Sequence, residues 1–450
     1  MEIDNLLAIS PIDGRYRKLT QNISKYFSEY AYIKYRILIE IEWLKKLLND
    51  DNFTKETVNT NKLMDIYADF DISEAKRVKE IEETTNHDVK AIEYYIREKL
   101  EKLGLEKYKC LVHFGCTSED VNNLAYSLML KDCLKKVIIP NIEELIENVK
   151  EKAVIRKGLP MLSHTHGQAA TPTTVGKELA VFVYRWNSIL EKIKNIKFKG
   201  KFSGAVGTYS AHVVAYDNID WIEYTKHFVE SLELEYNPLT TQIENHDTIC
   251  ELFSYIKLLN NITLDFNGDM WTYISMGYFK QKTIGTETGS SVMPHKVNPI
   301  NHENSMANVR VANSIIDNFN NNLQISRMQR DLSDSSNLRN IGVALAHTLV
   351  SVKQSIVAIN KMEVNEGVLE EELDKNPEVL AEAIQTVLRK NGYDNAYELL
   401  KNLTRGKKVT LDDIRKIVKE LDIDKKDKEK LLKLTPETYT GLAANLVDFI

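Results

Sequence analysis

The sequence contains few of the two residues that most often end or kink a helix. Its 450 residues include 18 glycines and 9 prolines, whereas average usage would give about 32 and 23. Glycine inside a helix costs about 1 kcal/mol relative to alanine, and proline about 3 kcal/mol. So few helix breakers over this length predict long helices.

Cysteine is also scarce. The four cysteines (Cys110, Cys116, Cys133 and Cys250) show no C-x-x-C spacing. This pattern implies neither a disulfide framework nor a zinc knuckle, and it fits a reducing compartment. The N-terminal residues MEIDNLLAISPIDGRYR lack a basic start followed by a long apolar run, so they are not a secretory signal. We expect a soluble, cytoplasmic protein.

The chain lacks an excess of positive charge. Its formal net charge is -6, with 43% hydrophobic and 28% charged residues, so nucleic acid and anionic membranes are not expected as partners. Two basic clusters, 192–201 (KIKNIKFKGK) and 424–433 (DKKDKEKLLK), are typical of solvated faces. The most apolar long segment, 341–359, contains a histidine, a lysine and a glutamine. It is predicted to be a buried core helix.

Helical periodicity is abundant. From Ile23 to position 48, apolar residues recur at steps of three and four, which marks one stripe of a long helix. Alternating strand-like runs are scarce. Similar helical patterns occupy five further segments, at 142–155, 172–196, 249–276, 303–325 and 337–360.

Two positions indicate domain boundaries. A glycine interrupts a charged helix end within 101–110 (EKLGLEKYKC), and shorter, highly charged helical patterns follow 361–367 (KMEVNEG). Helices of about 20–30 residues span roughly 30–45 Å and need partners along their length. We therefore expect an all-α protein with a central long-helix bundle, completed by other subunits. Its three helical domains are predicted at 1–108, 109–361 and 362–450.

The segment GSSVMPHKVNP (289–299) contains no acidic residue. Together with Gly285 it predicts a glycine-hinged loop that closes over a ligand. A serine acts as a base only where nearby cations and amide dipoles stabilise its alkoxide, and His295 and Lys296 supply such cations. The alternative is a structural turn with a helix cap.

The segment SHTHGQ (163–168) places His164 and His166 two residues apart. An H-x-H pair occurs in metal-dependent hydrolases, but no H-E-x-x-H motif or acidic cluster follows it. A second interpretation is a general acid–base histidine at a loop-to-helix junction, because imidazole titrates near neutrality. A third is a purely structural histidine. The residues alone leave these three open.

Two further segments have the composition of helix starts. TTNHDVKA (84–91) contains adjacent His87 and Asp88. A capped helix start explains this pair as well as a functional role does. CTSEDVNN (116–123) places hydroxyls before two acids. Hydroxyls and amides at such a helix start also bind carboxylates.

Arginines and hydroxyls gather in two other segments. QRDLSDSSNLRN (329–340) places Arg330 and Arg339 around three serines, and DGRYR adds Arg15 and Tyr16 near the N-terminus. Arginine with hydroxyls is the usual combination for binding phosphate. Such mixtures are also common on surfaces, so this segment alone decides nothing.

Taken together, these motifs resemble those of one family. GSSVMPHKVNP closely resembles the pattern G-S-S-x-M-P-x-K-x-N of the fumarase/aspartase superfamily, and the histidine in MPHK resembles adenylosuccinate lyases. DGRY, TTNHDVKA, TSED, HTHGQ, TQIENHD (241–247) and QRDLSDSSNLRN are similar to the same family and occur in its order. The resemblance covers most of the chain and is greatest to bacterial-type enzymes.

The resemblance implies a fold, an assembly and a reaction. The fold is a three-domain, nearly all-helical subunit whose central helices form the twenty-helix core of a homotetramer. Each active site takes loops from three subunits. The reaction is β-elimination of fumarate from adenylosuccinate to give AMP, and from the succinylcarboxamide intermediate SAICAR to give AICAR. The resemblance implies no cofactor and no metal.

It also implies roles for single residues. Ser290 is the base, His166 is the acid, and Lys296 and Asn298 hold a carboxylate of the substrate. An acidic residue in this loop would repel the doubly charged succinyl group, which accounts for the absence of one. The full set implied to bind substrate is Arg15, Tyr16, Asn86, His87, Asp88, Thr117, Ser118, Gln242, Ser291, Lys296, Val297, Asn298, Asn304, Arg330, Ser335 and Arg339.

Within that set, Thr117 and Ser118 are implied to help with the carboxylate. His87 and Gln242 orient the succinyl and leaving-group region, with Asn304 nearby. The arginines, Tyr16 and Ser335 match nucleotide and phosphate contacts.

Other interpretations remain beside this one. Another superfamily member, such as an argininosuccinate lyase or a cycloisomerase, is disfavoured by the arginine–serine segment, which indicates a phosphorylated substrate. A lyase-derived lens crystallin is disfavoured because the reactive side chains are all present. Ser291 could exchange roles with Ser290 on chemistry alone, although its place in the motif favours Ser290. Ala169 stands where the family often has proline.

Overall fold

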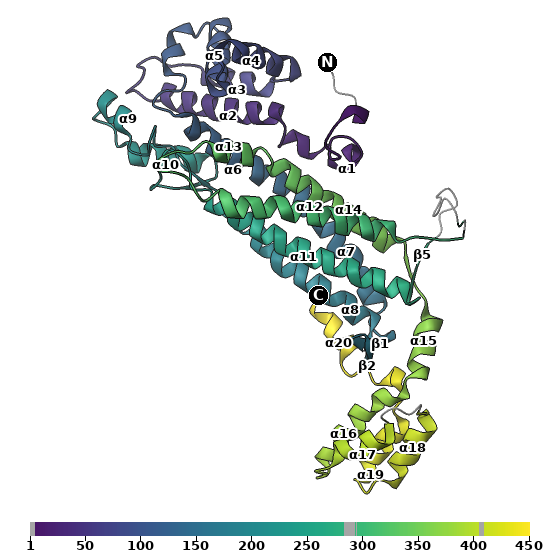
Figure 1. Ribbon diagram of the computed structural model, residues 1–450. Coiled ribbons are helices and arrows are strands. Elements are labelled where there is room, and N and C mark those ends of the chain that lie inside the picture. The colour runs from purple at the N-terminus through teal and green to yellow at the C-terminus, as the bar shows by residue number, and fades with distance from the viewer. Residues whose placement is uncertain (1–4, 283–292, 294, 405–408) are drawn as a thin grey trace. The chain divides into compact units, whose positions relative to one another are not determined.

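The computed structural model describes residues 5–282, 293, 295–404 and 409–450. Within them the chain is predominantly α-helical (Figure 1). The helices of the first half are α1 (Arg17–Thr20), α2 (Glu29–Leu48), α3 (Leu63–Ala68), α4 (Ile72–Thr85), α5 (Asp88–Lys102), α6 (Ser118–Cys133), α7 (Ile139–Ile155), α8 (Val175–Lys194), α9 (Ser210–Ala215) and α10 (Trp221–Ser231). Those of the second half are α11 (Asp247–Ser275), α12 (Ile300–Asn322), α13 (Ser333–Leu338), α14 (Ile341–Asn360), α15 (Glu366–Lys375), α16 (Ala381–Lys390), α17 (Ala396–Thr404), α18 (Leu411–Glu420), α19 (Lys425–Lys433) and α20 (Ala443–Leu446).

Strands in the described residues form three small pairs. The antiparallel hairpin of β1 (Pro160–Thr165) and β2 (Gln168–Thr174) is the longest of them. The others join β3 (Lys199–Gly200) to β4 (Glu235–Tyr236) in parallel, and β5 (Phe279–Gln281) to β6 (Met362–Val364) in antiparallel fashion. The expected all-α class is confirmed. The β1–β2 hairpin was not expected, because its residues show no clear alternation of apolar and polar side chains.

The contacts divide the chain into two compact units. Unit 1 contains Met1–Ile142, Leu190–Asn261 and Ala307–Ser351, and unit 2 contains Glu143–Ile189, Ile262–Met306 and Val352–Ile450. The three domains predicted from the sequence, at 1–108, 109–361 and 362–450, stay a prediction.

The predicted long helices are present. The patterns at 142–155, 172–196, 249–276, 303–325 and 337–360 correspond to α7, α8, α11, α12 and α14. The bounds differ by a few residues: the first residues of the second pattern belong to β2, and those of the last pattern belong to α13. The helix predicted from Ile23 begins instead at Glu29, since the Ser28 side chain caps α2 by accepting the amide of Ala31 at 3.1 Å.

Three long helices pack on one another within unit 1. Phe253 of α11 contacts Phe319 of α12 edge to face, with ring centroids 5.0 Å apart. The Asn260 amide of α11 donates to the hydroxyl of Thr348 in α14 at 3.1 Å, and both residues are buried. A buried polar pair of this kind fixes the positions of the two helices along their axes, because sliding one helix would leave the amide without a partner.

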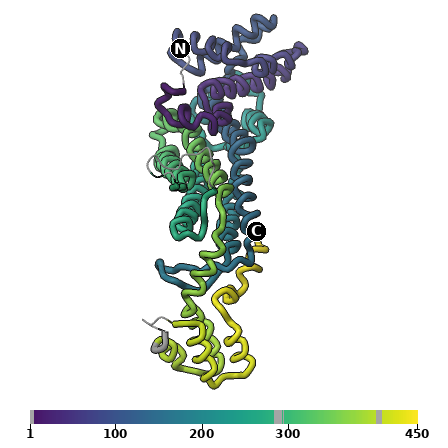
Figure 2. Tube along the Cα trace, turned by 90° about the vertical axis from the view of Figure 1, so that its right-hand side faces the viewer, coloured from purple at the N-terminus to yellow at the C-terminus, as the bar shows by residue number. Residues whose placement is uncertain are grey.

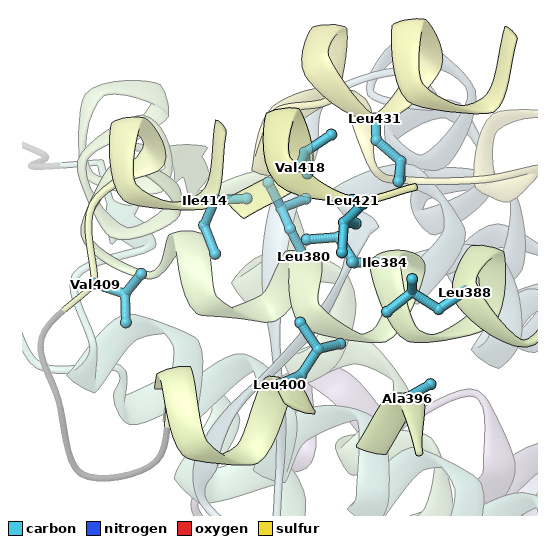
Figure 3. Close-up of a cluster of buried hydrophobic side chains, with 10 residues drawn as sticks. All are labelled: Leu380, Ile384, Leu388, Ala396, Leu400, Val409, Ile414, Val418, Leu421 and Leu431. Carbon is cyan, nitrogen blue, oxygen red and sulfur yellow. The ribbon is translucent and has the colours of Figure 1, made fainter. Parts of the chain in front are cut away.

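Helices α16 to α19 of unit 2 lie together (Figure 2) and have a hydrophobic core of their own (Figure 3). Short helices α16 to α19 surround a group of buried aliphatic side chains (Figure 3). Thr410 caps α18 and Asp424 caps α19, which fixes where each helix begins. The core residues are Leu380, Ile384, Leu388, Ala396, Leu400, Val409, Ile414, Val418, Leu421 and Leu431.

One helical stretch among the described residues is long and apolar enough to cross a membrane. It runs from Ser333 to Asn360, with a mean hydropathy of 1.4 in its most apolar window, and 78% of that window is buried inside the protein. Its side chains therefore pack against other parts of the chain, as predicted for a core helix.

Candidate active site

A tight turn between α4 and α5 contains the predicted residues Asn86, His87 and Asp88. Asn86 ends α4 with φ of 49°, a left-handed conformation that asparagine adopts more readily than most residues. His87 is the N-cap of α5, and its Nδ1 accepts the amide of Lys90 at 3.2 Å. In the neutral ring this bond leaves the proton on Nε2, so Nε2 is the nitrogen that can donate to a ligand.

Two arginines hold Asp88. Its carboxylate accepts from Arg36 at 2.8 Å and from Arg339 at 3.5 Å, and the amide of Val89 donates to it at 2.9 Å. Burial opposes the charge of this carboxylate, but Arg36, the Val89 amide and Arg339 together outweigh burial, so the pKa of Asp88 lies below its usual value. Arg36 is itself buried, and its guanidinium lies 3.5 Å from the ring centroid of Tyr32.

A cavity of about 150 Å³ lies beside Arg339 in unit 1. It is smaller than the roughly 300–1,000 Å³ of typical small-molecule sites, so it has room for a phosphate group but not for a whole nucleotide. Its lining consists of Phe27, Ser28, Glu29, Tyr32, Tyr126, Met129, Leu338 and Arg339.

Thr117 and Ser118 stand at the start of α6. The carboxylate of Asp120 accepts the amide of Thr117 at 2.8 Å, which holds the entry of the chain into the helix. Both predicted residues are half-buried. Their hydroxyls lie where the α6 amides and the helix dipole favour an anion.

Beneath this helix start lies a fully buried ion pair. Lys201 Nζ is 2.8 Å from Asp120, and both side chains are 0% exposed. The other acceptor positions of Asp120 are filled by the amides of Ser203 at 2.9 Å and Gly204 at 3.1 Å. Asn123 joins the group, because it accepts the amide of Lys201 at 2.8 Å and donates to its carbonyl at 3.0 Å.

Lys201 corrects one expectation from the sequence. The cluster 192–201 was predicted to be a solvated face, which is wrong for its last residue, Lys201. The chain leaves α8 at Lys194, and β3 then runs beside α6. There the Lys201 ammonium contacts the Asp120 carboxylate and donates to the carbonyl of Gly204 at 3.0 Å.

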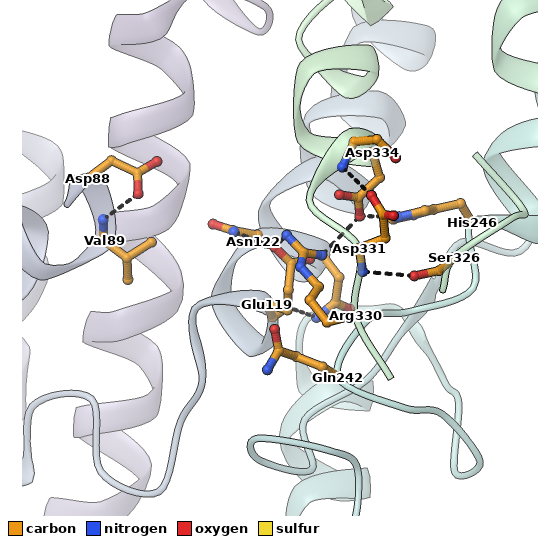
Figure 4. Close-up of polar contacts among 12 residues, drawn as sticks. Asp88, Val89, Glu119, Asn122, Gln242, His246, Ser326, Arg330, Asp331 and Asp334 are labelled. Carbon is orange, nitrogen blue, oxygen red and sulfur yellow. Dashed lines mark hydrogen bonds and ion pairs between the residues drawn. The ribbon is translucent and has the colours of Figure 1, made fainter. Parts of the chain in front are cut away.

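Arg330 is oriented by two carboxylates (Figure 4). It donates to Asp334 at 2.9 Å and to Glu119 at 3.3 Å. Asp334 also contacts Nε2 of the buried His246, at 3.1 Å. Glu119 directly follows Ser118, so the ion pair ties the arginine to the start of α6.

Gln242 lies close to the same group (Figure 4). Its backbone amide donates to the carbonyl of Gln329 at 3.2 Å, and its side-chain amide donates to the carbonyl of Ala205 at 2.8 Å. Ser335 lies in α13, five residues after Arg330. The segments around α6, Gln242 and α13 therefore meet within unit 1.

Arg15 and Tyr16 lie just before α1. Arg15 is exposed and Tyr16 is half-buried. The structure shows no contact between Arg15 and another predicted site residue within the described part of the chain.

His166 occupies the tip of the β1–β2 hairpin in unit 2. Thr165 pairs with Gln168, so His166 and Gly167 form a two-residue turn, with φ of 55° and 74°. Both left-handed conformations are those of a type I′ turn, which explains the glycine. His166 is exposed. The expectation of a loop-to-helix junction is wrong: the residue projects from a hairpin, which presents a side chain to solvent more rigidly than a free loop.

The predicted carboxylate-binding residues Lys296, Val297 and Asn298 lie directly before α12, and Asn304 lies in its second turn. Lys296 and Val297 are exposed, and Asn298 is half-buried. Ser290 and Ser291, predicted to be the base and its neighbour, lie outside the described residues.

A buried polar network fixes the start of α12 within unit 2. His302 Nδ1 lies 2.8 Å from the side-chain oxygen of Asn267 in α11. The Asn267 amide donates to Ser305 at 3.1 Å and to Ser355 of α14 at 2.9 Å. Burial lowers the pKa of His302 to about 4. The imidazole therefore stays neutral at physiological pH, and its bond to Asn267 helps to hold the start of α12, which follows Lys296, in one position against α11.

Among the described residues, no group of three or more His, Cys, Asp or Glu side chains is placed to hold a metal ion. His164 lies opposite Ala169 in the hairpin, and its ring is 6.1 Å from that of Tyr278. The hairpin forms with alanine at position 169, where the family often has proline.

Sequence reasoning missed the residues that orient the site. Arg36, Lys201 and Asp334 were not singled out, although each holds a predicted residue or the helix that carries it. Arg36 and Lys201 lie far along the chain from their partners Asp88 and Asp120, whereas Asp334 is four residues from Arg330. The available signal was weak: a charged residue within an apolar stripe, such as Arg36 in α2.

Two family models match the chain. One, described as lyase, matches residues 14–315, and the other, described as adenylosuccinate lyase C-terminal, matches residues 326–440. Together they cover nearly all of the described helices.

Curated relatives match over the full length. The adenylosuccinate lyase of Legionella pneumophila (strain Corby) is 48% identical over 452 residues, covering 99% of each chain. Those of Haemophilus influenzae and Escherichia coli (strain K12) are 47% and 44% identical, and both cover 100% of this chain and 99% of the relative.

Solved structures share the fold. The 3-carboxy-cis,cis-muconate lactonizing enzyme of Pseudomonas putida has a TM-score of 0.74 at 20% identity, covering 95% of this chain and 96% of that one. A fumarate lyase from Mesorhizobium sp. BNC1 has a TM-score of 0.75 at 18% identity, covering 95% and 97%.

Proposed function

The chain belongs to the adenylosuccinate lyases of the fumarase/aspartase superfamily, and we propose that it cleaves adenylosuccinate into AMP and fumarate by β-elimination. The observation that carries this proposal is 44–48% identity over essentially the whole chain to curated adenylosuccinate lyases, together with retention of the reactive set His166, Ser290 and Lys296. The protein is a carbon–nitrogen lyase of purine biosynthesis.

The chemistry needs a base, an acid and a cation. Ser290 removes the proton from Cβ of the succinyl group, and the resulting carbanion is delocalised onto the adjacent carboxylate. The C–N bond then breaks as His166 protonates the departing purine nitrogen. Lys296 and Asn298 bind the carboxylate on which negative charge develops, and the exposed position of Lys296 keeps its ammonium available to substrate.

The nucleotide end needs different groups. Arg330 and Arg339 each have guanidinium planes fixed by two carboxylates, so a phosphate meets donors that are already oriented. We propose that these arginines, with Arg15 and Ser335, bind the phosphate, and that His87 donates through Nε2 near the leaving group.

A direct assay tests the function. Purified protein is mixed with adenylosuccinate, and AMP and fumarate are followed by absorbance and by chromatography. Equal amounts of both products are expected. Turnover of argininosuccinate in place of adenylosuccinate would favour the other superfamily reaction.

A second substrate is proposed on the same chemistry. SAICAR carries the same succinyl group on a nitrogen and the same phosphate, so the acid, base and cation have identical tasks. We propose that the protein also releases fumarate from SAICAR to give AICAR, and the same assay with SAICAR tests this.

We further propose a homotetramer with shared active sites. The cavity beside Arg339 is too small for a nucleotide, which favours a site completed by other subunits. Exposed apolar side chains along the long helices support association: Tyr184, Leu258, Trp271, Val311 and Val357.

Mixing two inactive variants tests the shared site. His166→Ala and Ser290→Ala proteins are unfolded and refolded together in equal amounts, so that subunits combine at random. About a quarter of the sites should contain both intact side chains if these come from independent chains of a closed oligomer, and activity should recover to that level. Mixed tetramers, verified by mass measurement, that stay inactive would contradict the shared site.

The activity should not depend on a metal. The charges of the substrate are met by Lys296 and the arginines, and no metal-binding cluster occurs among the described residues. Dialysis against a strong chelator is expected to leave turnover unchanged. A loss of turnover that zinc restores would revive the H-x-H metal interpretation of His164 and His166.

A further inference from the structure

Unit 1 contains a second, larger cavity that the proposed lyase reaction does not use. Its volume is about 500 Å³, within the range of small-molecule sites. None of its lining residues belongs to the predicted active site. They are Lys131, Leu134, Lys135, Ile139, Ile193, Lys194, Ile196, Lys197, Phe198, Glu233 and Glu235.

The floor of this cavity is apolar. Leu134, Ile193 and Phe198 line it and are 3%, 2% and 8% exposed, so most of each side chain packs against the protein interior. The half-buried Ile139 and Ile196 extend the apolar wall. A flat or branched hydrocarbon group bound on this floor would be removed from contact with water, which is favourable.

Lysines surround this floor. Four lysines and two glutamates line the cavity, which leaves an excess of two positive charges on a chain whose net charge is -6. Lys131 is paired with Glu233 at 2.6 Å, and Lys194 with Glu191 at 3.4 Å. Lys135 and Lys197 are exposed, and no ion pair of either is found within the described part of the chain.

A π-helix shapes one wall. Residues Leu134–Ile138 form a π-helical turn between α6 and α7. The wider turn brings Leu134 toward the face of Lys135 and Ile139, which are four residues apart and would share a face on an α-helix as well. Single π-helical turns of this kind cost stability and often occur at functional sites. Here the turn brings one cation and two apolar groups to the same cavity.

We propose that this cavity binds a small amphipathic dianion, namely a phosphate joined to an apolar group. The apolar group would lie on Leu134, Ile193 and Phe198. The phosphate would lie between Lys135 and Lys197, which are exposed and form no ion pair among the described residues, although the charge of Lys135 also acts on the nearby Glu233. The proposal is independent of the lyase function, because the site shares no residue with the predicted active site.

The experiment measures binding of phenyl phosphate by isothermal titration calorimetry, with inorganic phosphate and phenol as its two halves. Phenyl phosphate should bind about tenfold more tightly than phosphate, because its ring becomes buried, and phenol should bind weakly. The double variant Lys135→Glu with Lys197→Glu should bind phenyl phosphate at least about tenfold more weakly than the parent protein.

A matched control is Lys55→Glu with Lys76→Glu, which makes the same charge change at exposed positions outside the cavity. It should leave binding nearly unchanged. Both double variants should keep the kcat and KM of the parent for adenylosuccinate. That result would show that this cavity takes no part in the lyase reaction. If the glutamate variant melts early, Lys135→Met with Lys197→Met replaces it.

Three results would overturn the proposal. The first is no binding of phenyl phosphate by the parent protein at millimolar concentration. The second is equal affinity in the cavity variant and the parent, which would place the ligand elsewhere. The third is equal weakening by the control pair, which would indicate a general charge effect and only solvated lysines around the cavity.

Discussion

His166→Ala protein should turn over adenylosuccinate at least about a hundred-fold more slowly than the parent, and Ser290→Ala protein should do the same. A positioned proton donor or acceptor contributes about 10²–10⁴ to the rate, and each variant lacks one. His166 is exposed at a hairpin tip, so its removal leaves no cavity in a core. Steady-state kinetics should show the loss in kcat, with the thermal melting curve of His166→Ala unchanged.

Neighbouring residues provide the controls. His164→Ala removes an exposed histidine two residues before His166, in β1, and Ser291→Ala removes the hydroxyl next to Ser290. Both should retain far more turnover than the variants at 166 and 290. Near-normal turnover in His166→Ala or Ser290→Ala would retire the role assigned to that residue. A larger loss in Ser291→Ala than in Ser290→Ala would transfer the role of base to Ser291.

The long helices could be predicted because their determinants are local. Apolar residues at steps of three and four define the buried stripes of α7, α8, α11, α12 and α14, and few glycines or prolines interrupt them. The β1–β2 hairpin could not be predicted in this way. Its two strands, PMLSHT and QAATPTT, do not alternate apolar and polar residues, and the His166–Gly167 turn is the local signal for a hairpin.

The sequence suggests reactive residues for the site, and their roles stay predictions, but it does not suggest the residues that hold them. Motifs such as TSED and HTHGQ lie in short, continuous segments, so their resemblance to a family is visible in one sequence. The partners of these motifs come from distant segments: Arg36 reaches Asp88, and Lys201 reaches Asp120. Such pairs depend on how the helices pack, which the sequence of either segment alone does not specify.

Lys201→Met protein should be less stable than the parent by about 3–5 kcal/mol, because the buried Asp120 carboxylate would lose its counter-ion while remaining out of water. The backbone amides of Thr117, Ser203 and Gly204 would still donate to it, so the protein need not unfold completely. Denaturant unfolding followed by circular dichroism measures the loss. Lys199→Met is the matched control, because Lys199 is half-exposed and lies 3.9 Å from the exposed Glu235.

The same substitution should also weaken substrate binding. Asp120 accepts the amide of Thr117 and thereby fixes the start of α6, where Thr117 and Ser118 are proposed to bind a carboxylate of the substrate. A shift of Asp120 toward Ser203 and Gly204 after loss of the lysine would move both hydroxyls, so KM should rise in folded Lys201→Met protein while Lys199→Met keeps the parent value. A Lys201→Met protein with parental stability would show that the ion pair is not needed to hold the carboxylate. Parental KM despite reduced stability would show that the pair supports the fold without positioning the substrate-binding hydroxyls.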